Sequence, residues 1–258
     1  MPDLFAHQQF GNRVLERMPA YVNLDKEVFI WAQEGPDIWS YWKPWKRNKR
    51  SWTVHNEKSE QFVEFLLNNY PDNKAVVSYA LGFLCHIIYD EYAHPFIDDS
   101  AFCINNLWKD CDHIALERAI DIRMMSQYGK TPRCLLVNWP KKGIKLVESA
   151  INQAYETIYG WNKCSLSIRS AYRTRFILYL MFWDPLGILY TLGRLFGIDK
   201  LKSLSYYGKT SLPDVAYSES SINWDELSKS FDNITGNAIG KAADMIVNHY
   251  AISVKVNQ

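Results

Sequence analysis

The sequence predicts an all-α fold in a single domain of residues 1–258. Apolar residues recur at the three- to four-residue spacing of amphipathic helices along most of the chain, whereas the strict alternation of β-strands is scarce. Hydrophobic residues make up 48% of the chain, which is enough to build a core. Because no internal repeat and no low-complexity linker interrupts the chain, we expect one helical domain.

The first part of the chain alternates helix and loop patterns. Residues 4–17 place apolar residues among polar ones in the manner of a short amphipathic helix. Gly35-Pro36-Asp37 predicts a turn, and the stretch 39–52, rich in Trp and basic residues, predicts a loop. Residues 57–70 again repeat apolar residues at helical spacing, and Pro71 is predicted to end this helix.

The longest predicted helix covers residues 73–94. Asn73 suits its N-cap, and apolar residues from Val76 to Ile88 form a wide face. Pro95 is predicted to end it, because the residue before a proline avoids helical dihedral angles. A further helix is predicted over 112–127, closed by Gly129.

The second half of the chain is also predicted to be helical. Helical patterns cover 143–160, 165–182, 186–204 and 222–250. The most apolar stretch, 176–198, is interrupted by Asp184-Pro185 and carries Arg194, so no transmembrane segment is predicted. We expect a buried hairpin of core helices in this stretch, with docking on a membrane as the alternative.

The bulk properties exclude several classes. The net charge of +1 gives no global bias toward nucleic acid or membranes. Five cysteines without a CxxC pair disfavour a disulfide framework and favour a reducing compartment. The N-terminus lacks the basic start, apolar middle and cleavage site of a signal peptide, so we expect a cytoplasmic protein.

The histidines are concentrated near the start of the chain. His86 and Asp90 are four residues apart on one predicted helix, and His113 and Glu117 repeat the spacing on another. Such pairs share a helix face, with Cβ atoms about 5–6 Å apart, and can reach one zinc ion at about 2.0–2.2 Å. His94 lies one further turn along the first helix, where it can serve a neighbouring ion.

Each candidate ligand also has a structural interpretation. Ordinary helix hydrogen bonds and surface pairs produce the same four-residue spacing. His7 could instead be a histidine of the core, and His55 could be a surface loop residue. Asp37 could be the N-cap of a helix. His249 is late and isolated in the sequence, and we interpret it as structural.

The order of these motifs resembles a known family. AHxxFG near the N-terminus, GPD about thirty residues later, a lone His, then YALGFLCHIIYDEYAHPFID and HIALE resemble the zinc-dependent phospholipase C family of bacteria. The wider superfamily includes the fungal single-strand-specific zinc nucleases and the N-terminal domain of glycosylphosphatidylinositol-specific phospholipase D. The resemblance covers roughly residues 1–125, the metal-site half, and leaves 126–258 as a helical C-terminal half.

The resemblance implies an all-α domain with a cluster of two or three zinc ions. Asp37, His55, His86 and Asp90 would surround one zinc ion, and His94, His113 and Glu117 would hold a second. His7 and a bridging Asp90 would hold a third, together with the amine and carbonyl of the first residue. The chain departs from the secreted members in starting with Met1-Pro2 rather than a Trp, and in its shorter gap between Asp90 and His94.

The resemblance also implies hydrolysis of a phosphodiester, either a phospholipid or a soluble analogue, with Asp37 as general base. Two alternatives stay open: a single-strand nuclease with the same zinc cluster, and a metal-binding protein without turnover. The basic, Trp-rich stretch 39–52 suits an exposed loop with some Trp in the core. It equally suits a rim that contacts a membrane surface or stacks on bases.

Overall fold

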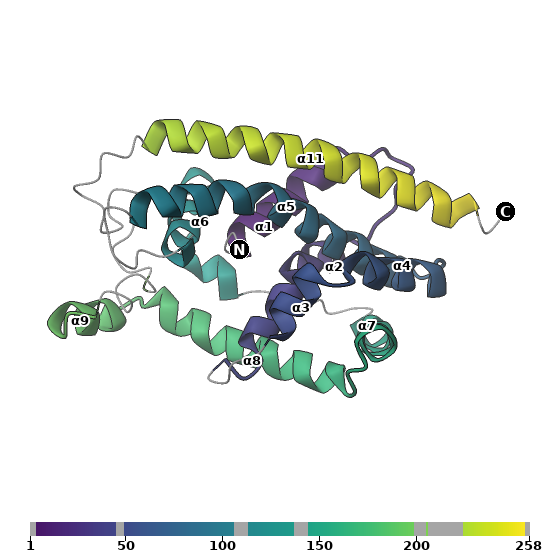
Figure 1. Cartoon of the computed structure of the whole chain (residues 1–258), viewed down its shortest axis with the longest axis horizontal. Coiled ribbons are helices and arrows are strands. Elements are labelled where there is room, and N and C mark those ends of the chain that lie inside the picture. Colours follow the sequence, from purple (N-terminus) through teal and green to yellow (C-terminus); the bar gives the residue numbers. More distant parts are fainter. Residues whose placement is uncertain are drawn as a thin grey trace. The chain divides into compact units, whose positions relative to one another are not determined.

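The computed structural model describes residues 4–44, 49–105, 113–136, 144–198, 205 and 224–255 (Figure 1). All regular secondary structure within these residues is helical, and they contain no strand. The predicted all-α fold is therefore confirmed.

The N-terminal helices follow the apolar pattern of the sequence. Helix α1 covers Leu4–Glu16 and α4 covers Ser59–Asn69, close to the predicted ranges. Helix α2, Lys26–Trp31, was not predicted, because six residues are too few to show a helical period. Its start is set locally, since the carboxylate of Asp25 accepts a hydrogen bond from the backbone N–H of Val28.

The stretch 39–52 is a loop only in part. The 3-10 helix η1 covers Ala32–Tyr41, and α3 covers Arg50–Asn56. Trp39 is fully buried, and its indole N–H donates to the hydroxyl of Tyr155 at 2.9 Å. The Arg50 guanidinium lies over the rings of Trp39, Trp42 and Trp161, at 4.9, 4.2 and 4.5 Å from their centroids. Burial of the aromatic rings thus organises a stretch whose composition indicates a loop; residues 45–48 lie outside the described residues.

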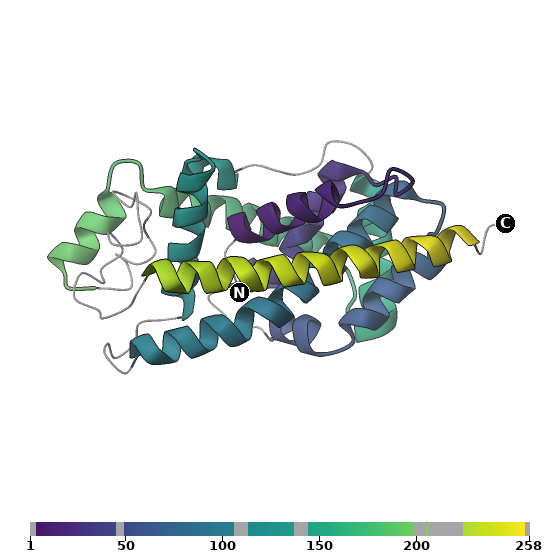
Figure 2. The ribbon, with the colours of Figure 1, turned by 90° about the horizontal axis from the view of Figure 1, so that it is seen from above.

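Helix α5 covers Lys74–Asn105, and with α11 (Trp224–Lys255) it is one of two 32-residue helices in the described part of the chain (Figures 1 and 2). The predicted N-cap is confirmed, because the Asn73 side chain accepts from the backbone N–H of Val76 at 3.0 Å. The prediction that Pro95 ends this helix is wrong. A proline inside a helix costs about 3 kcal/mol. Burial of Ala93 and Ile97, both at 0% exposure, offsets that cost on either side of it.

The remaining elements are α6 (His113–Gln127), η2 (Pro132–Leu136), α7 (Ile144–Tyr159), α8 (Cys164–Trp183) and α9 (Ile188–Leu195). Helices α6, α7 and α8 start and end close to their predicted bounds. Helix α9 is shorter than the predicted 186–204, and Gly197 follows it at a φ of 64°. Residues 199–204 lie outside the described residues.

The chain forms two compact units. Unit 1 comprises Met1–Ala6, Asp90–Val137 and Phe176–Gly236, and unit 2 comprises His7–Tyr89, Asn138–Arg175 and Asn237–Gln258. In unit 2, an aromatic core joins α4, α5 and α7, where Phe62 lies 4.7 Å from both Phe83 and Tyr155. In unit 1, Phe96 of α5 contacts Phe231 of α11 with a centroid distance of 5.8 Å. The single-domain prediction stays a prediction.

The predicted burial of the stretch 176–198 is wrong. On α8 the exposed apolar side chains are Phe176, Ile177, Leu180 and Met181. On the following turn and α9 they are Leu186, Ile188, Leu192, Leu195, Phe196 and Ile198. We call these ten side chains the apolar tip.

No single helix of the described residues has the length and apolar composition needed to cross a membrane. Leu166–Trp183 and Ile188–Leu195 pass that test only as a pair, and the two are bent by 69°.

A glycine in α5 permits the close approach of α2 and η1. A Cβ atom at Gly82 would clash with the carbonyl oxygen of Phe29 and would lie 2.8 Å from the Cβ of Ala32. Because Phe29 and Ala32 belong to packed helices, neither can move away at a low cost in free energy. Gly82 therefore sets how closely η1 lies against α5, one helical turn before His86.

We expect Gly82→Ala to lower the free energy of unfolding by about 1–3 kcal/mol, as overpacking of a core does. Gly236→Ala is the matched control, because Gly236 is also inside a helix, but a Cβ atom there would meet no other atom within 4 Å. The control is expected to be neutral or stabilising by up to about 1 kcal/mol. Urea unfolding monitored by circular dichroism measures both, and equal effects would contradict the proposed close approach.

Candidate metal centre

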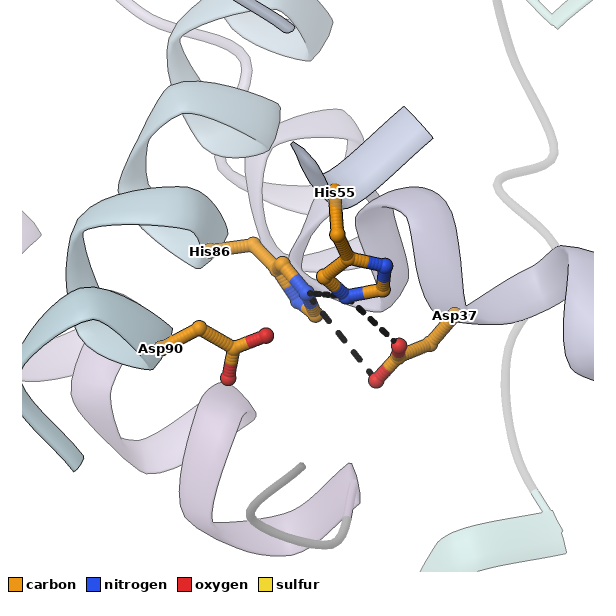
Figure 3. A group of neighbouring side chains, drawn as sticks. All are labelled: Asp37, His55, His86 and Asp90. Carbon is orange, nitrogen blue, oxygen red and sulfur yellow. Dashed lines mark hydrogen bonds and ion pairs between the residues drawn. The ribbon is translucent and has the colours of Figure 1, made fainter. Parts of the chain in front are cut away.

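Four of the predicted ligands converge at one place in the structure. Asp37 of η1, His55 of α3, and His86 and Asp90 of α5 each offer one ligand atom, and these atoms all lie within 4.8 Å of one another (Figure 3). Asp90 begins the Asp90–Val137 segment of unit 1, yet it follows His86 by one turn of the same helix, so α5 itself fixes their spacing. This is the set that the resemblance assigns to one zinc ion.

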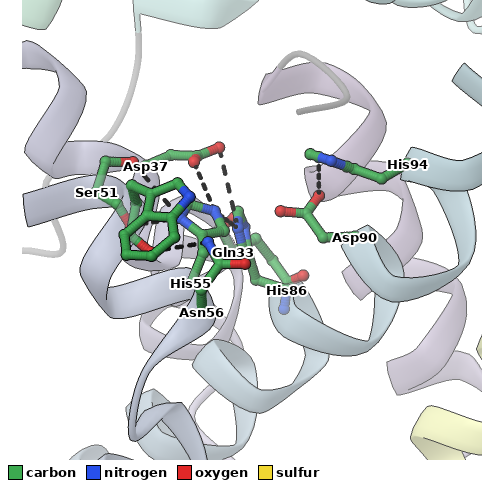
Figure 4. A network of polar contacts seen from close by, with 9 residues as sticks. Gln33, Asp37, Ser51, His55, Asn56, His86, Asp90 and His94 are labelled. Carbon is green, nitrogen blue, oxygen red and sulfur yellow. Dashed lines mark hydrogen bonds and ion pairs between the residues drawn. The ribbon is translucent and has the colours of Figure 1, made fainter. Parts of the chain in front are cut away.

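The hydrogen bonds of the two histidines determine which ring nitrogen faces the group. Nδ1 of His86 lies 2.8 Å from the carbonyl oxygen of Gln33, and Nδ1 of His55 lies 2.7 Å from that of Ser51 (Figure 4). A carbonyl oxygen only accepts hydrogen bonds, so both Nδ1 atoms carry hydrogen and donate. Each neutral ring then presents the lone pair of Nε2 to the group, as in histidines that bind metal ions.

Two of the distances between the ligand atoms are close to the edges of a tetrahedron around zinc, and a third is longer. The two Nε2 atoms are 3.2 Å apart. Nε2 of His55 is 3.0 Å from Oδ1 of Asp37, and Nε2 of His86 is 3.9 Å from Oδ2. Ligands at about 2.0–2.1 Å from a tetrahedral zinc ion are about 3.3 Å from one another. Two nitrogen lone pairs that face each other at this distance repel, and a shared cation or proton removes the repulsion.

The burial of the group strengthens the case for a cation. His86 is fully buried, while Asp37 and Asp90 are 8% and 7% exposed. Two buried carboxylates are costly unless positive charge compensates them. Two imidazole nitrogens and two carboxylate oxygens are also the donor types that zinc prefers in proteins. The residues present therefore fit a zinc ion.

The Gly-Pro-Asp motif brings η1 against His86. Gly35 has a φ of 42° and a ψ of −131°, a backbone conformation that favours glycine. A Cβ atom there would lie 2.8 Å from Cγ of His86, so a side chain would also displace the imidazole. The predicted turn is thus a bend inside η1, and it places Asp37 beside the two histidines.

Gln33 contacts the candidate site, and sequence reasoning missed it. Its carbonyl oxygen accepts from His86, and its side-chain amide donates to the carbonyl oxygen of Gly82 at 3.1 Å. The residue is fully buried and joins η1 to α5 through both groups. A buried glutamine close to a turn gives no pattern that sequence analysis can detect.

The other predicted ligands lie outside this group of four. His7 stacks on His86 at 4.1 Å between ring centroids, with 11° between the ring planes, and meets Tyr89 edge-on. Nε2 of His94 lies 3.6 Å from Oδ1 of Asp90 (Figure 4), and Glu117 is buried in α6. His113 begins α6, but its side chain, like Met1 and Pro2, lies outside the described residues. Their roles as ligands of further ions stay predictions.

Asp121 anchors the start of α1 and was also missed. Its two carboxylate oxygens accept from the backbone N–H groups of Phe5 and Ala6, at 2.9 and 2.8 Å. The side chain is fully buried. A carboxylate at a helix N-terminus satisfies backbone donors that the helix leaves open and interacts favourably with its dipole. This contact fixes the helix start directly before His7.

A buried ion pair holds the start of η1. Nη1 of Arg175 lies 2.6 Å from Oε1 of Glu34, and both side chains are nearly inaccessible, at 4% and 6%. Burial raises the pKa of Glu34 from 4.5 to about 7, while the Arg175 guanidinium and a hydrogen bond with Tyr172 act in the opposite direction. Glu34 precedes Asp37 by three residues, so the pair stabilises the segment that carries the carboxylate.

We expect Arg175→Met to lower the free energy of unfolding by about 3–5 kcal/mol near neutral pH, because it leaves a buried carboxylate without its partner. Glu34 has a higher pKa in the folded than in the unfolded chain, so the folded chain binds protons more readily and the stability it contributes falls as the pH rises from about 4.5 to 7. Without Arg175 the free energy of unfolding falls more steeply over this pH range. The difference in stability between wild type and variant shrinks below about pH 4.5, where the Glu34 carboxyl is protonated in both the folded and the unfolded chain.

Urea unfolding across this pH range measures the deficit. Arg173→Met is the matched control, because it removes an exposed arginine of the same helix. The control is expected to change the free energy of unfolding by less than about 0.5 kcal/mol. A deficit that is independent of pH would show that Glu34 is not the group responsible.

Comparison with known proteins places these residues in a family. A model of the family described as zinc dependent phospholipase C matches residues 6–172, which include all eight predicted ligands. No curated protein and no solved structure matches the chain. The family match covers more than half of the sequence, and the group of Asp37, His55, His86 and Asp90 lies inside it. The chain belongs to the zinc dependent phospholipase C family.

Proposed function

We propose that this protein is a zinc-dependent hydrolase that cleaves phosphodiesters in the manner of a phospholipase C. The observation that carries the proposal is the orientation of His55 and His86, whose Nε2 atoms both face Asp37 because their Nδ1 atoms donate to backbone carbonyls. The family to which the chain belongs supports zinc as the metal and phospholipid as the substrate class.

Asp37, His55, His86 and Asp90 would hold one zinc ion, and the predicted set of His7, His94, His113 and Glu117 would extend the site to two or three ions. Zinc, when bound, supplies a Lewis acid that activates water near neutral pH and offsets the negative charge of the phosphate. The carbonyl oxygens of Gln33 and Ser51 orient the two imidazoles for this task.

Asp37 is the proposed general base. Its side chain is 11% exposed and lies 3.0 Å from the imidazole of His55, whose side chain is 14% exposed. Both side chains are therefore partly accessible to solvent, whereas His86 is fully buried. A carboxylate in this position accepts a proton from the attacking water while the histidines keep the reacting groups aligned.

The packing of the Trp-rich stretch gives no support to a nuclease that stacks bases on Trp39 or Arg50. Trp39 is in the core, and the guanidinium of Arg50 is stacked on three indole rings. These groups are therefore committed to packing rather than open to bases and phosphates. Among the described tryptophans of this stretch, Trp52 has the exposure that stacking on a base requires.

The zinc content of the purified protein tests the metal centre. Wild-type protein is expected to contain at least one tightly bound zinc ion per chain, and His86→Ala and Asp90→Asn are expected to lose zinc. Each removes a ligand and leaves the backbone of α5 unchanged. His249→Ala, at the histidine interpreted as structural, should keep the wild-type content. Elemental analysis of protein purified without chelator measures the zinc content per chain. Wild-type protein without zinc would contradict the proposed metal centre.

Hydrolysis of a short-chain phosphatidylcholine tests the activity, with released phosphocholine as the readout. Asp37→Asn is expected to lower the rate by about 10²–10⁴-fold, because the amide accepts no proton and is a poorer ligand. Chelation should abolish the reaction and added zinc restore it. Degradation of single-stranded DNA in place of the phospholipid would favour the nuclease, and stoichiometric zinc without any hydrolysis would favour a non-catalytic metal-binding protein.

A further inference from the structure

The apolar tip is the largest group of exposed apolar side chains in the described residues. Its most exposed members are Leu186, Leu195 and Phe196, at 78%, 72% and 71%. Soluble domains normally bury side chains of this size, and a contiguous exposed group of them marks an interaction surface. The group lies beyond residue 172, outside the part of the chain that the family model matches.

The tip is built by two short amphipathic faces. On α9, Ile188, Leu192 and Leu195 follow one another at spacings of four and three residues, and all three are exposed. On α8, Phe176, Ile177, Leu180 and Met181 form a second exposed stripe. The turn that carries Leu186 joins them, and the two helix axes are bent by 69°.

Within residues 176–198 the one exposed charge is cationic. Within 176–198 the charged residues are Asp184 and Arg194. Asp184 is buried, and its carboxylate accepts from the backbone N–H groups of Leu189 and Tyr190 and from the hydroxyl of Ser205, at 3.1, 2.9 and 2.7 Å. Arg194 is exposed. The tip therefore presents apolar and cationic groups to solvent, while the buried Asp184 carboxylate accepts hydrogen bonds within the fold.

The exposed stripe of α8 is basic at Arg169 and Arg173 and apolar from Phe176 on. Arg169 and Arg173 are exposed and stand four residues apart, and Phe176 and Ile177 continue the stripe one turn later. Arg173 precedes Met181 by eight residues, which is about 12 Å along a helix. Interfacial apolar groups insert by about 5–10 Å. If α8 enters the interface with its Met181 end first, Arg173 lies at the level of the lipid headgroups.

We propose that the apolar tip docks on the surface of a phospholipid bilayer, with Arg173 and Arg194 contacting anionic headgroups. The choice of lipid as the occupant rests on the proposed function, because a phospholipase must reach substrate at a membrane. Within 176–198, exposed leucines are accompanied by an exposed arginine and by no exposed carboxylate, and this combination complements an anionic membrane surface.

Binding to vesicles tests this surface in the full chain. The triple variant Leu186→Ser/Leu195→Ser/Phe196→Ser replaces three side chains that are more than two-thirds exposed, so the fold is expected to persist, as circular dichroism can show. Leu166→Ser is the matched control, because Leu166 is 64% exposed on the same α8 but lies outside the tip. Co-sedimentation with vesicles of equal parts phosphatidylglycerol and phosphatidylcholine measures the affinity of each protein.

We expect the triple variant to bind these vesicles at least about tenfold more weakly than wild type, since three inserted side chains contribute most of such an interaction. The Leu166→Ser control should bind as wild type does. Arg173→Gln/Arg194→Gln should reduce binding to the anionic vesicles and leave binding to pure phosphatidylcholine unchanged.

Two results would overturn the proposal: equal binding of wild type and triple variant, or a wild-type dimer that the triple variant converts to a monomer while neither binds vesicles. The second result would assign the tip to self-association. Hydrolysis of a monomeric short-chain substrate separates this test from that of the proposed function. The triple variant should cleave it at the wild-type rate. A chain that binds vesicles through the tip but cleaves no phosphodiester would support docking and contradict the enzyme.

Discussion

The site depends on two hydrogen bonds from imidazole to backbone. Because the carbonyl oxygens of Gln33 and Ser51 each hold an Nδ1–H, the Nε2 atoms of His86 and His55 face each other at 3.2 Å beside Asp37. Neither ring can turn away without leaving a partly buried donor unsatisfied, which costs more than an ordinary hydrogen bond gains. The close approach of two lone pairs and two carboxylates is therefore imposed by the fold, and a divalent cation would make it favourable.

The elements around the group serve this arrangement. Gly82 and Gly35 remove the side chains that would keep η1 away from α5, and Gln33 links the two through its carbonyl and its amide. The buried pair of Glu34 and Arg175 then holds η1 from its other side. Burying these polar groups costs free energy, and the nearby aromatic core of Phe62, Phe83 and Tyr155 stabilises the fold against that cost.

The C-terminal half shows a different use of apolar residues. From Phe176 on, many apolar residues of α8 and α9 are exposed, whereas most apolar residues of α4 and α5 are buried. The carboxylate of Asp184 closes the intervening turn by capping the start of α9, so the turn is ordered although it contains Pro185 and Gly187. A rigid turn with exposed leucines suits contact with a surface, because little conformational freedom is lost on binding.

The sequence by itself determined the all-α class, most helix positions, and the pairing of His86 with Asp90, since a four-residue spacing on a helix is a local property. It did not show that Pro95 lies inside α5, that His55 belongs to a helix, or that Gln33, Asp121 and Arg175 support the site. It also placed the residues of the apolar tip in the core. The supporting roles of Asp121 and Arg175 depend on contacts between segments far apart in the chain, as between Glu34 and Arg175 or Phe5 and Asp121. Local periodicity shows which residues are apolar, but only tertiary packing decides which of them are covered and which carbonyl a histidine meets.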